Sequence, residues 1–215
     1  MRTRPILAAS GSALLFACGG TVAHAGDGGG GGLGRLGGVG TVGAALPASG
    51  TAFSVVEDGD MVMECDGVVH RFEVRGAGRL RVGNRIAGAT PTAVVSTDAE
   101  QLTGYDADLG TVTVTEKAPV LGEIVAPAEG RPYPAAESFA QDLTVAMEHS
   151  PCRGGRPAAY ASKTAFPLLN TDLTAFPPRN AVYLLTDPVE LVDVTDPSAP
   201  SFTLTAFPVT VSRTV

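Results

Sequence analysis

Hydrophobic and polar residues alternate along most of the chain after residue 50. The alternating runs are short, rich in Val, Thr and Phe, and separated by turns that contain Gly, Pro or Asp. A period of two is typical of strands that bury one face, and no segment shows a sustained helical period. The runs are AFSVV, MVMEC, VVHRFEV, RLRVGNRI, TAVVS, GTVTVTE, SFAQDLTVAME, NAVYLL, VELVDV and SFTLTAFPVTV. The pattern predicts an all-β fold, a single-domain antiparallel β-sandwich or barrel of about ten strands.

The run ESFAQDLTVAMEH comes nearest to a helix in length, but its alternation favours a strand. Its large apolar residues share one face, and its polar residues share the other. The apolar face holds Phe139, Leu143, Val145 and Met147. We therefore expect this face to be buried.

The N-terminus has the pattern of a secretory signal peptide. Two arginines precede the short apolar run ILAASGSALLFA, and a small-x-small motif, AHA, ends at Ala25. This order predicts a signal peptide over residues 1–25. The apolar run is too short for a transmembrane helix, and no later segment is long and apolar enough. We therefore expect no transmembrane segment after the signal peptide.

A second cleavage site remains an alternative. The sequence LFAC, which ends at Cys18, resembles a bacterial lipobox. In that motif the cysteine is acylated and becomes the new N-terminus, although the motif prefers a small residue where this chain has Phe16. Two localisations follow: a secreted protein released after Ala25, or an exported protein anchored by lipid at the outer face of the membrane.

Residues 26–50 are dominated by glycine. Glycine at this density does not bury enough apolar surface to offset the entropy of ordering, which predicts a flexible, disordered linker. The β domain is then expected over residues 51–215.

Two cysteines, Cys65 and Cys152, remain once the leader is removed. In an exported chain such a pair predicts a disulfide, and no C-x-x-C motif suggests a metal or redox site instead. Because Cys65 ends one predicted strand and Cys152 follows another, we expect those two strands to be neighbours in the fold.

The charge balance excludes one class of partner. The formal charge is −7, and loss of residues 1–25, which contain Arg2 and Arg4 but no acid, makes it −9. Nucleic-acid binding needs a basic surface, so none is expected. Acidic residues cluster around Gly59, before Gly110 and between Asp193 and Asp196. They lack the spacing of a calcium loop and are interpreted as solvated turns, without metal or cofactor.

The phrase Thr-Ala-Phe-Pro occurs three times, with its phenylalanines at Phe166, Phe176 and Phe207. A residue before proline is extended, and proline is confined to strand ends, bulges and edges. The three phenylalanines are therefore expected to fill the core near the ends of strands. The alternative is a Phe-Pro surface that captures an apolar partner.

Catalytic motifs are absent from the sequence: there is no G-x-S-x-G, no H-E-x-x-H and no phosphate-binding glycine loop. We therefore assign no catalytic residue. His70 shares the apolar face of VVHRFEV, which favours a hydrogen-bonded core histidine. The competing hypothesis is a small β-barrel enzyme in which His70 faces a carboxylate in an open pocket.

Arginines concentrate around Gly76-Ala77-Gly78, which we expect to close a hairpin. Such a hairpin places four arginines on one face with a single acid, Glu73. The four are Arg71, Arg75, Arg79 and Arg81. The alternatives are a solvated strand face and an anion-binding site for an acidic envelope polymer.

The phrases LGTVTVTE, YPAAESFAQDLTV, LTAFPPRNAVYLL and DPVELVDVTDPSAP resemble an exported bacterial family of β-rich domains without an established function. The resemblance runs from about Asp60 to the C-terminus and implies a secreted β-fold, with no catalytic residue. Together these features predict an exported protein with a binding or structural role in the cell envelope or outside the cell.

Overall fold

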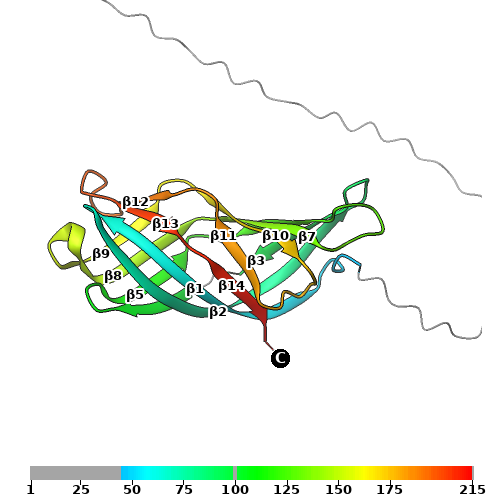
Figure 1. Ribbon diagram of the computed structural model, residues 1–215, viewed down its shortest axis with the longest axis horizontal. Helices are drawn as coiled ribbons and strands as arrows, with labels where there is room; N and C mark the ends of the chain where they lie inside the picture. Colours follow the sequence, from blue (N-terminus) through cyan, green and yellow to red (C-terminus); the bar gives the residue numbers. More distant parts are fainter. Residues whose placement is uncertain (1–44, 99–100, 215) are drawn as a thin grey trace, which may run out of the picture. The chain divides into compact units, whose positions relative to one another are not determined.

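The computed structural model describes residues 45–98 and 101–214, and almost all of its regular structure is strand (Figure 1). The all-β prediction is confirmed. The elements are β1 (Ala52–Cys65), β2 (Val68–Ile86), β3 (Thr92–Thr97), β4 (Gln101–Asp106), β5 (Gly110–Glu116), β6 (Leu121–Val125), β7 (Ala135–Gln141), β8 (Leu143–Ser150), the 3-10 helix η1 (Pro151–Arg153), β9 (Arg156–Ser162), β10 (Phe166–Leu173), β11 (Ala181–Leu185), β12 (Val189–Asp193), β13 (Phe202–Ala206) and β14 (Val209–Arg213).

The described part of the chain has 14 strands, so the prediction of about ten was too low. The predicted runs before and after Gly59 merge into β1, whereas the run around Asp142 divides into β7 and β8. Four strands, β4, β6, β9 and β10, were not predicted at all. Strands such as QLTGYD and LGEIV carry a glycine, and their apolar residues do not alternate regularly with polar ones.

All pairings are antiparallel, and they close the sheet into a barrel rather than a sandwich. β1 pairs with β2 along its whole length. The first half of β1 then pairs with β14 and its last residues with β13, while β2 pairs with β4 and then with β3. Two closed circuits result, which share β1 and β2.

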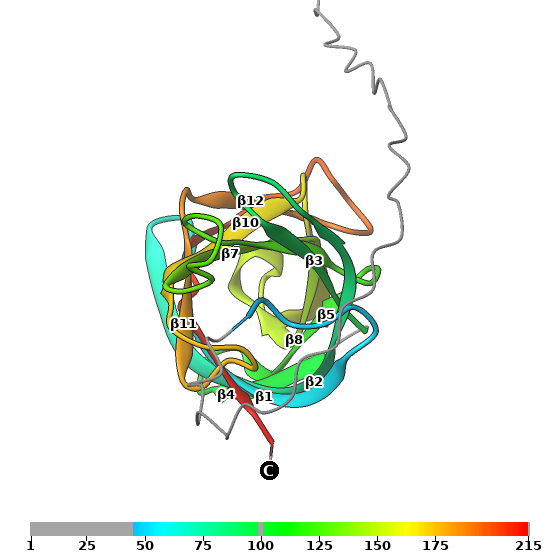
Figure 2. The same cartoon turned by 90° about the vertical axis from the view of Figure 1, so that its right-hand side faces the viewer.

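One circuit runs β1-β14-β11-β10-β7-β6-β3-β2 and returns to β1. The other runs β1-β13-β12-β9-β8-β5-β4-β2 and also returns to β1. Figure 1 shows the strands of the second circuit toward one end of the barrel and those of the first toward the other. Figure 2 shows the ring that the strands make around the interior.

The hairpin predicted at Gly76-Ala77-Gly78 is wrong, because β2 continues straight through these residues. Gly76 pairs with Glu57 of β1 on one side and with Leu102 of β4 on the other. A Cβ atom on Gly76 would collide with the carbonyl oxygen of Gln101. Gly76 thus permits a close approach of strands rather than a turn.

Alternation sets the inner face of each strand, as the sequence predicts. The apolar face of ESFAQDLTVAMEH is buried, although a break at Asp142 divides it between β7 and β8. Large side chains fill the interior, including Tyr160 packed edge-on against Phe202 and Phe139 packed edge-on against Tyr183. Burial of such side chains is the main source of stability in a fold with no tryptophan.

The disulfide prediction is confirmed: Cys65 and Cys152 are bonded, with their Cα atoms 6.2 Å apart. The expected adjacency of their strands is wrong, because β13, β12 and β9 lie between β1 and β8 in the sheet. The bridge instead joins the end of β1 to η1, the turn that follows β8.

Two of the three Thr-Ala-Phe-Pro copies place a fully packed phenylalanine, as predicted. Phe166 at the start of β10 and Phe207 between β13 and β14 are buried. Phe176 is only partly buried and packs edge-on against Phe53, with ring centroids 5.3 Å apart. The ring of Phe207 packs directly against Gly59, where a Cβ atom would lie only 2.7 Å from the ring.

The predicted signal peptide, Cys18 and residues 26–44 of the predicted linker lie outside the described residues. The described part of the linker is packed, because Leu46 is buried in the core and Gly50 donates its backbone N–H to the carbonyl of Val82. Within residues 45–98 and 101–214, no helix is long and apolar enough to cross a membrane.

Candidate ligand-binding site

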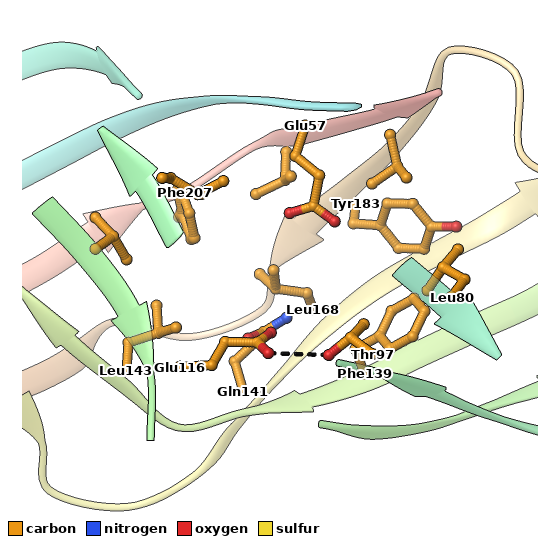
Figure 3. Close-up of a pocket in the computed structure, with 14 residues that line it drawn as sticks. Glu57, Leu80, Thr97, Glu116, Phe139, Gln141, Leu143, Leu168, Tyr183 and Phe207 are labelled. Carbon is orange, nitrogen blue, oxygen red and sulfur yellow. Dashed lines mark hydrogen bonds between the residues drawn. The ribbon is translucent and has the colours of Figure 1, made fainter. Parts of the chain in front are cut away.

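A cavity lies inside the barrel where the two circuits meet (Figure 3). Strands of both circuits supply its walls, and most of the wall residues are apolar. The lining residues are Glu57, Leu80, Thr97, Leu102, Val114, Glu116, Phe139, Gln141, Leu143, Leu168, Tyr183, Phe207, Val209 and Val211. The third Thr-Ala-Phe-Pro phenylalanine is thus both a core residue and a cavity wall.

The space between these walls measures about 520 Å³, including the part that joins the solvent. Only about 30 Å³ of it is open to the centre of a water molecule. This is room for about one or two water molecules, so a larger ligand must displace side chains of the wall.

Two carboxyl groups stand at inward positions of strands whose other inward residues are mostly apolar. In β1, Glu57 lies between the inward residues Val55 and Gly59, and it is buried. In β5, Glu116 continues the inward series of Val112 and Val114. Figure 3 shows these two side chains entering the cavity from opposite sides.

We predicted that Glu57, Asp58 and Asp60 form a solvated turn around Gly59, and this is wrong. All three lie in the middle of β1, where Asp58 and Asp60 face outward and Glu57 faces inward. The sequence contains a sign of this inward orientation: a charged residue stands at a position of the strand where the alternation calls for an apolar one. The same signal marks Glu116 and Glu137.

Hydrogen bonds already engage the hydroxyl groups beside the carboxyls. Thr97 Oγ1 donates to Glu116 Oε2 at 2.9 Å. The hydroxyl of Tyr183 donates to Glu137 Oε2 through a short hydrogen bond. Two buried acceptors, Gln141 Oε1 and Glu137 Oε1, have no hydrogen-bond partner among the described residues.

Glu137 is the most deeply buried acid of this group, with none of its side chain exposed. Burial raises its pKa to about 7, although the hydrogen bond from Tyr183 favours the charged form. Burial and the nearby carboxyl of Glu137 also raise the pKa of Tyr133 to about 12, and they raise that of Tyr183. The tyrosines are therefore neutral donors at ordinary pH.

His70 is buried, as the core interpretation predicts, but its Nε2 has no hydrogen-bond partner among the described residues, so the expected hydrogen bond is not found there. It does not line the cavity. Its Nδ1 lies 3.9 Å from Asp106 Oδ1, and its ring lies edge-on to Phe202. Asp106 caps the β4–β5 turn, since Oδ1 accepts the backbone N–H groups of Asp108 and Leu109.

His70, Asp106 and Asp108 form one group of potential metal ligands, with ligand atoms within 4.8 Å of one another. The aspartates fit the predicted solvated turn, and we assign no metal to them.

The four arginines of the predicted anion site all point outward from β2, on one face as predicted, but in a line along a single strand. Arg75 forms ion pairs with Asp58 across to β1 and with Glu73 on its own strand. The first pair has an Nε–Oδ1 distance of 3.0 Å. These two acids neutralise the charge of Arg75, which lies between the other arginines on β2. Arg71, Arg79 and Arg81 are exposed.

Comparison with known proteins supports the fold only. No protein-family model matches the chain, and no curated protein matches it. Among solved structures, the chain is similar to DynF from the dynemicin biosynthesis pathway of Micromonospora chersina, with a TM-score of 0.65 and 20% sequence identity. The match covers 77% of this chain and 82% of that one. At this identity the likeness concerns the barrel and not its activity.

Proposed function

We propose that this protein is an exported β-barrel that binds a small, mostly apolar molecule in its interior, in the cell envelope or outside the cell. The observation that carries the proposal is the cavity, with apolar walls from both circuits and a few inward polar groups. Binding sites for small molecules combine these features, and they often lie inside β-barrels.

Export rests on the sequence of residues 1–25 and on the disulfide, a bond typical of oxidising compartments. The likeness to DynF supports the barrel itself and carries no argument about what the barrel binds. A barrel enzyme centred on His70 has less support, since His70 lies outside the cavity.

Dye binding to cavity variants tests the proposal. The neutral apolar dye N-phenyl-1-naphthylamine should bind the protein saturably, with a rise in fluorescence. Val114→Phe fills the cavity and should weaken binding by about tenfold or more, since the larger ring occupies the ligand's space. Val182→Phe is the matched control, because Val182 is 44% exposed on the outer face of β11.

Circular dichroism checks that each variant keeps its β structure, and Leu143→Phe is a second filling variant if Val114→Phe does not fold. Weaker binding to a folded filling variant, with the control unchanged, supports the proposal. No saturable dye binding to the wild type, or weakening by Val182→Phe alone, would overturn it.

A further inference from the structure

The second Thr-Ala-Phe-Pro copy lies in a loop that borders a hollow on the outside of the barrel. The loop, residues 174–180, joins β10 to β11, and the carbonyl of Pro178 accepts the backbone N–H of Arg213 at 3.1 Å. The hollow measures about 820 Å³, including the part that is open to the solvent. Its lining residues are Arg179, Asn180, Ser212 and Arg213. Two arginines from separate segments of the chain therefore line one space.

An aromatic pair supports the guanidinium group of Arg213. This group lies 5.5 Å from the centroid of the Phe53 ring, which is a cation–π contact. Phe53 packs edge-on against Phe176, with ring centroids 5.3 Å apart. The partly buried phenylalanine of the second copy thus braces the ring beneath an arginine, whereas the phenylalanines of the other two copies are buried in the core.

Two hydrogen bonds fix the other polar side chains of the hollow. Asn180, whose φ of 51° is in the left-handed region, donates its backbone N–H to Ser212 Oγ at 2.9 Å. Ser212 Oγ donates in return to Asn180 Oδ1 at 2.8 Å. The carbonyl oxygen of the Asn180 side chain is therefore engaged, while its Nδ2 group has no acceptor among the described residues. The hollow thus presents an amide donor beside the two arginines.

No nearby acid neutralises these two arginines within residues 45–98 and 101–214. No carboxylate oxygen of these residues lies within 4.0 Å of a guanidinium nitrogen of Arg179 or Arg213. Asp172 lines a neighbouring hollow together with Arg179 but forms no ion pair with it. Guanidinium groups present planar forks of N–H donors, which are suited to the oxygens of an anion.

We propose that Arg179, Arg213 and the side-chain amide of Asn180 bind a phosphate group. A phosphate offers three acceptor oxygens, one more than a carboxylate, to the donors of two guanidinium groups and an amide. Because the hollow is open to the solvent, the group can be free phosphate or part of a phosphate-bearing polymer. This inference is independent of the proposed function, since none of these residues lines the cavity.

Titration with inorganic phosphate, with sodium chloride adjusted to hold the ionic strength constant, tests the site. The NMR signals of the Asn180 side-chain amide should shift saturably. Arg179→Gln and Arg213→Gln should each weaken binding about tenfold or more, because each variant loses charge-assisted hydrogen bonds. Arg71→Gln is the matched control and should leave the affinity unchanged, since Arg71 is exposed and forms no ion pair with a described residue. Circular dichroism checks that each variant keeps its β structure.

The role of Phe53 as a positioning residue has its own test. Phe53→Leu removes the ring beneath Arg213 and should weaken phosphate binding about threefold. Phe53→Tyr keeps an aromatic ring and should keep the affinity of the wild type. Equal losses in both variants would show that Phe53 does not act through its ring.

A second titration, with poly(glycerol phosphate) at the same phosphate concentrations, distinguishes the two sources. Tighter binding of the polymer, lost in Arg179→Gln and Arg213→Gln, would identify a polymer as the ligand, and equal or weaker binding would identify free phosphate. The inference is overturned if neither probe shifts the Asn180 signals saturably at constant ionic strength. It is also overturned if both of these variants keep the affinity of the wild type, or if Arg71→Gln weakens binding as much as they do.

Discussion

Strand parity separates the roles of the neighbouring acids Glu57 and Asp58. Asp58 points outward and forms an ion pair with Arg75, whereas its neighbour Glu57 points inward and lines the cavity. The two residues are adjacent in the chain, but their carboxyl groups lie on opposite sides of the barrel wall, because successive residues of a strand face opposite ways. A charged residue at an inward position costs stability, which makes it a candidate for function.

Glu137 should make stability fall as pH rises. Its pKa is raised from 4.5 to about 7 in the folded state, so its contribution is fully present below pH 4.5 and is lost as pH rises through about 7. The loss is on the order of 3 kcal/mol. Glu137→Gln cannot ionise, so urea unfolding at several pH values between about 5 and 8 should show the variant gaining on the wild type by this amount.

Tyr183 and Tyr133 face Glu137, but both stay neutral in this range because their pKa values are raised. The surface variant Glu123→Gln should follow the wild type at every pH. Parallel curves for wild type and Glu137→Gln would show that the carboxyl titrates as an exposed one does.

The three Thr-Ala-Phe-Pro copies should differ in their energetic importance. Phe207→Ala empties a buried site against Gly59 and should lower the free energy of unfolding by about 3–5 kcal/mol. Phe176→Ala removes a partly buried ring and should cost clearly less. Denaturant unfolding of both variants gives the comparison, and an equal or reversed order would contradict the packing described here.

At the scale of elements, glycine has a different meaning in a strand than in a turn. Gly76 lies where β2 passes between β1 and β4, and a side chain there would strike the backbone of β4. Gly76→Ala should therefore destabilise the protein by about 1–3 kcal/mol, as overpacking does.

Gly83→Ala is the control in the same strand, since its Cβ would meet nothing closer than 3.5 Å. It should change the free energy of unfolding by less than about 1 kcal/mol. Denaturant unfolding measures both variants, and a harmless Gly76→Ala would mean that β4 does not approach β2 as closely as described.

The sequence predicts which face of a strand is buried, but it does not predict which strands pair with one another. Alternation alone predicts the buried side of ESFAQDLTVAMEH, and the period of two predicts the all-β class. Closure of the barrel depends on pairs such as Val55 with Arg213, which are far apart in the chain and leave no local mark. The Gly76 region was misinterpreted because glycine favours both turns and close strand contacts.

The sequence did not predict the cavity, because the cavity depends on strand pairings between distant parts of the chain. Each of its carboxyls shows a local anomaly, such as Glu57 among the inward residues of β1, but their convergence follows from the closure of two circuits. His70 attracted attention as a lone inward histidine, and the structure places it beside the β4–β5 turn instead.

For the whole molecule, the predicted export of the barrel depends on the sequence of its N-terminus. The predicted signal peptide implies a mature chain that begins at Gly26, because cleavage is expected after the Ala23–Ala25 motif. Intact-mass analysis of the protein secreted by a bacterial host measures this directly. A species that starts at Cys18 and carries a diacylglycerol would instead make the protein an anchored lipoprotein.

The central claim is that the barrel interior, and not its outer surface, binds a small molecule. Methyl NMR spectra recorded during a titration with N-phenyl-1-naphthylamine test it most directly, because each methyl group reports its own surroundings. We predict that the signals of Val114, Leu143 and Leu168 shift saturably, while those of Val182 and Leu184, exposed on the outer face of β11, stay in place. Shifts confined to the outer methyl groups, with the cavity signals unchanged, would contradict the account.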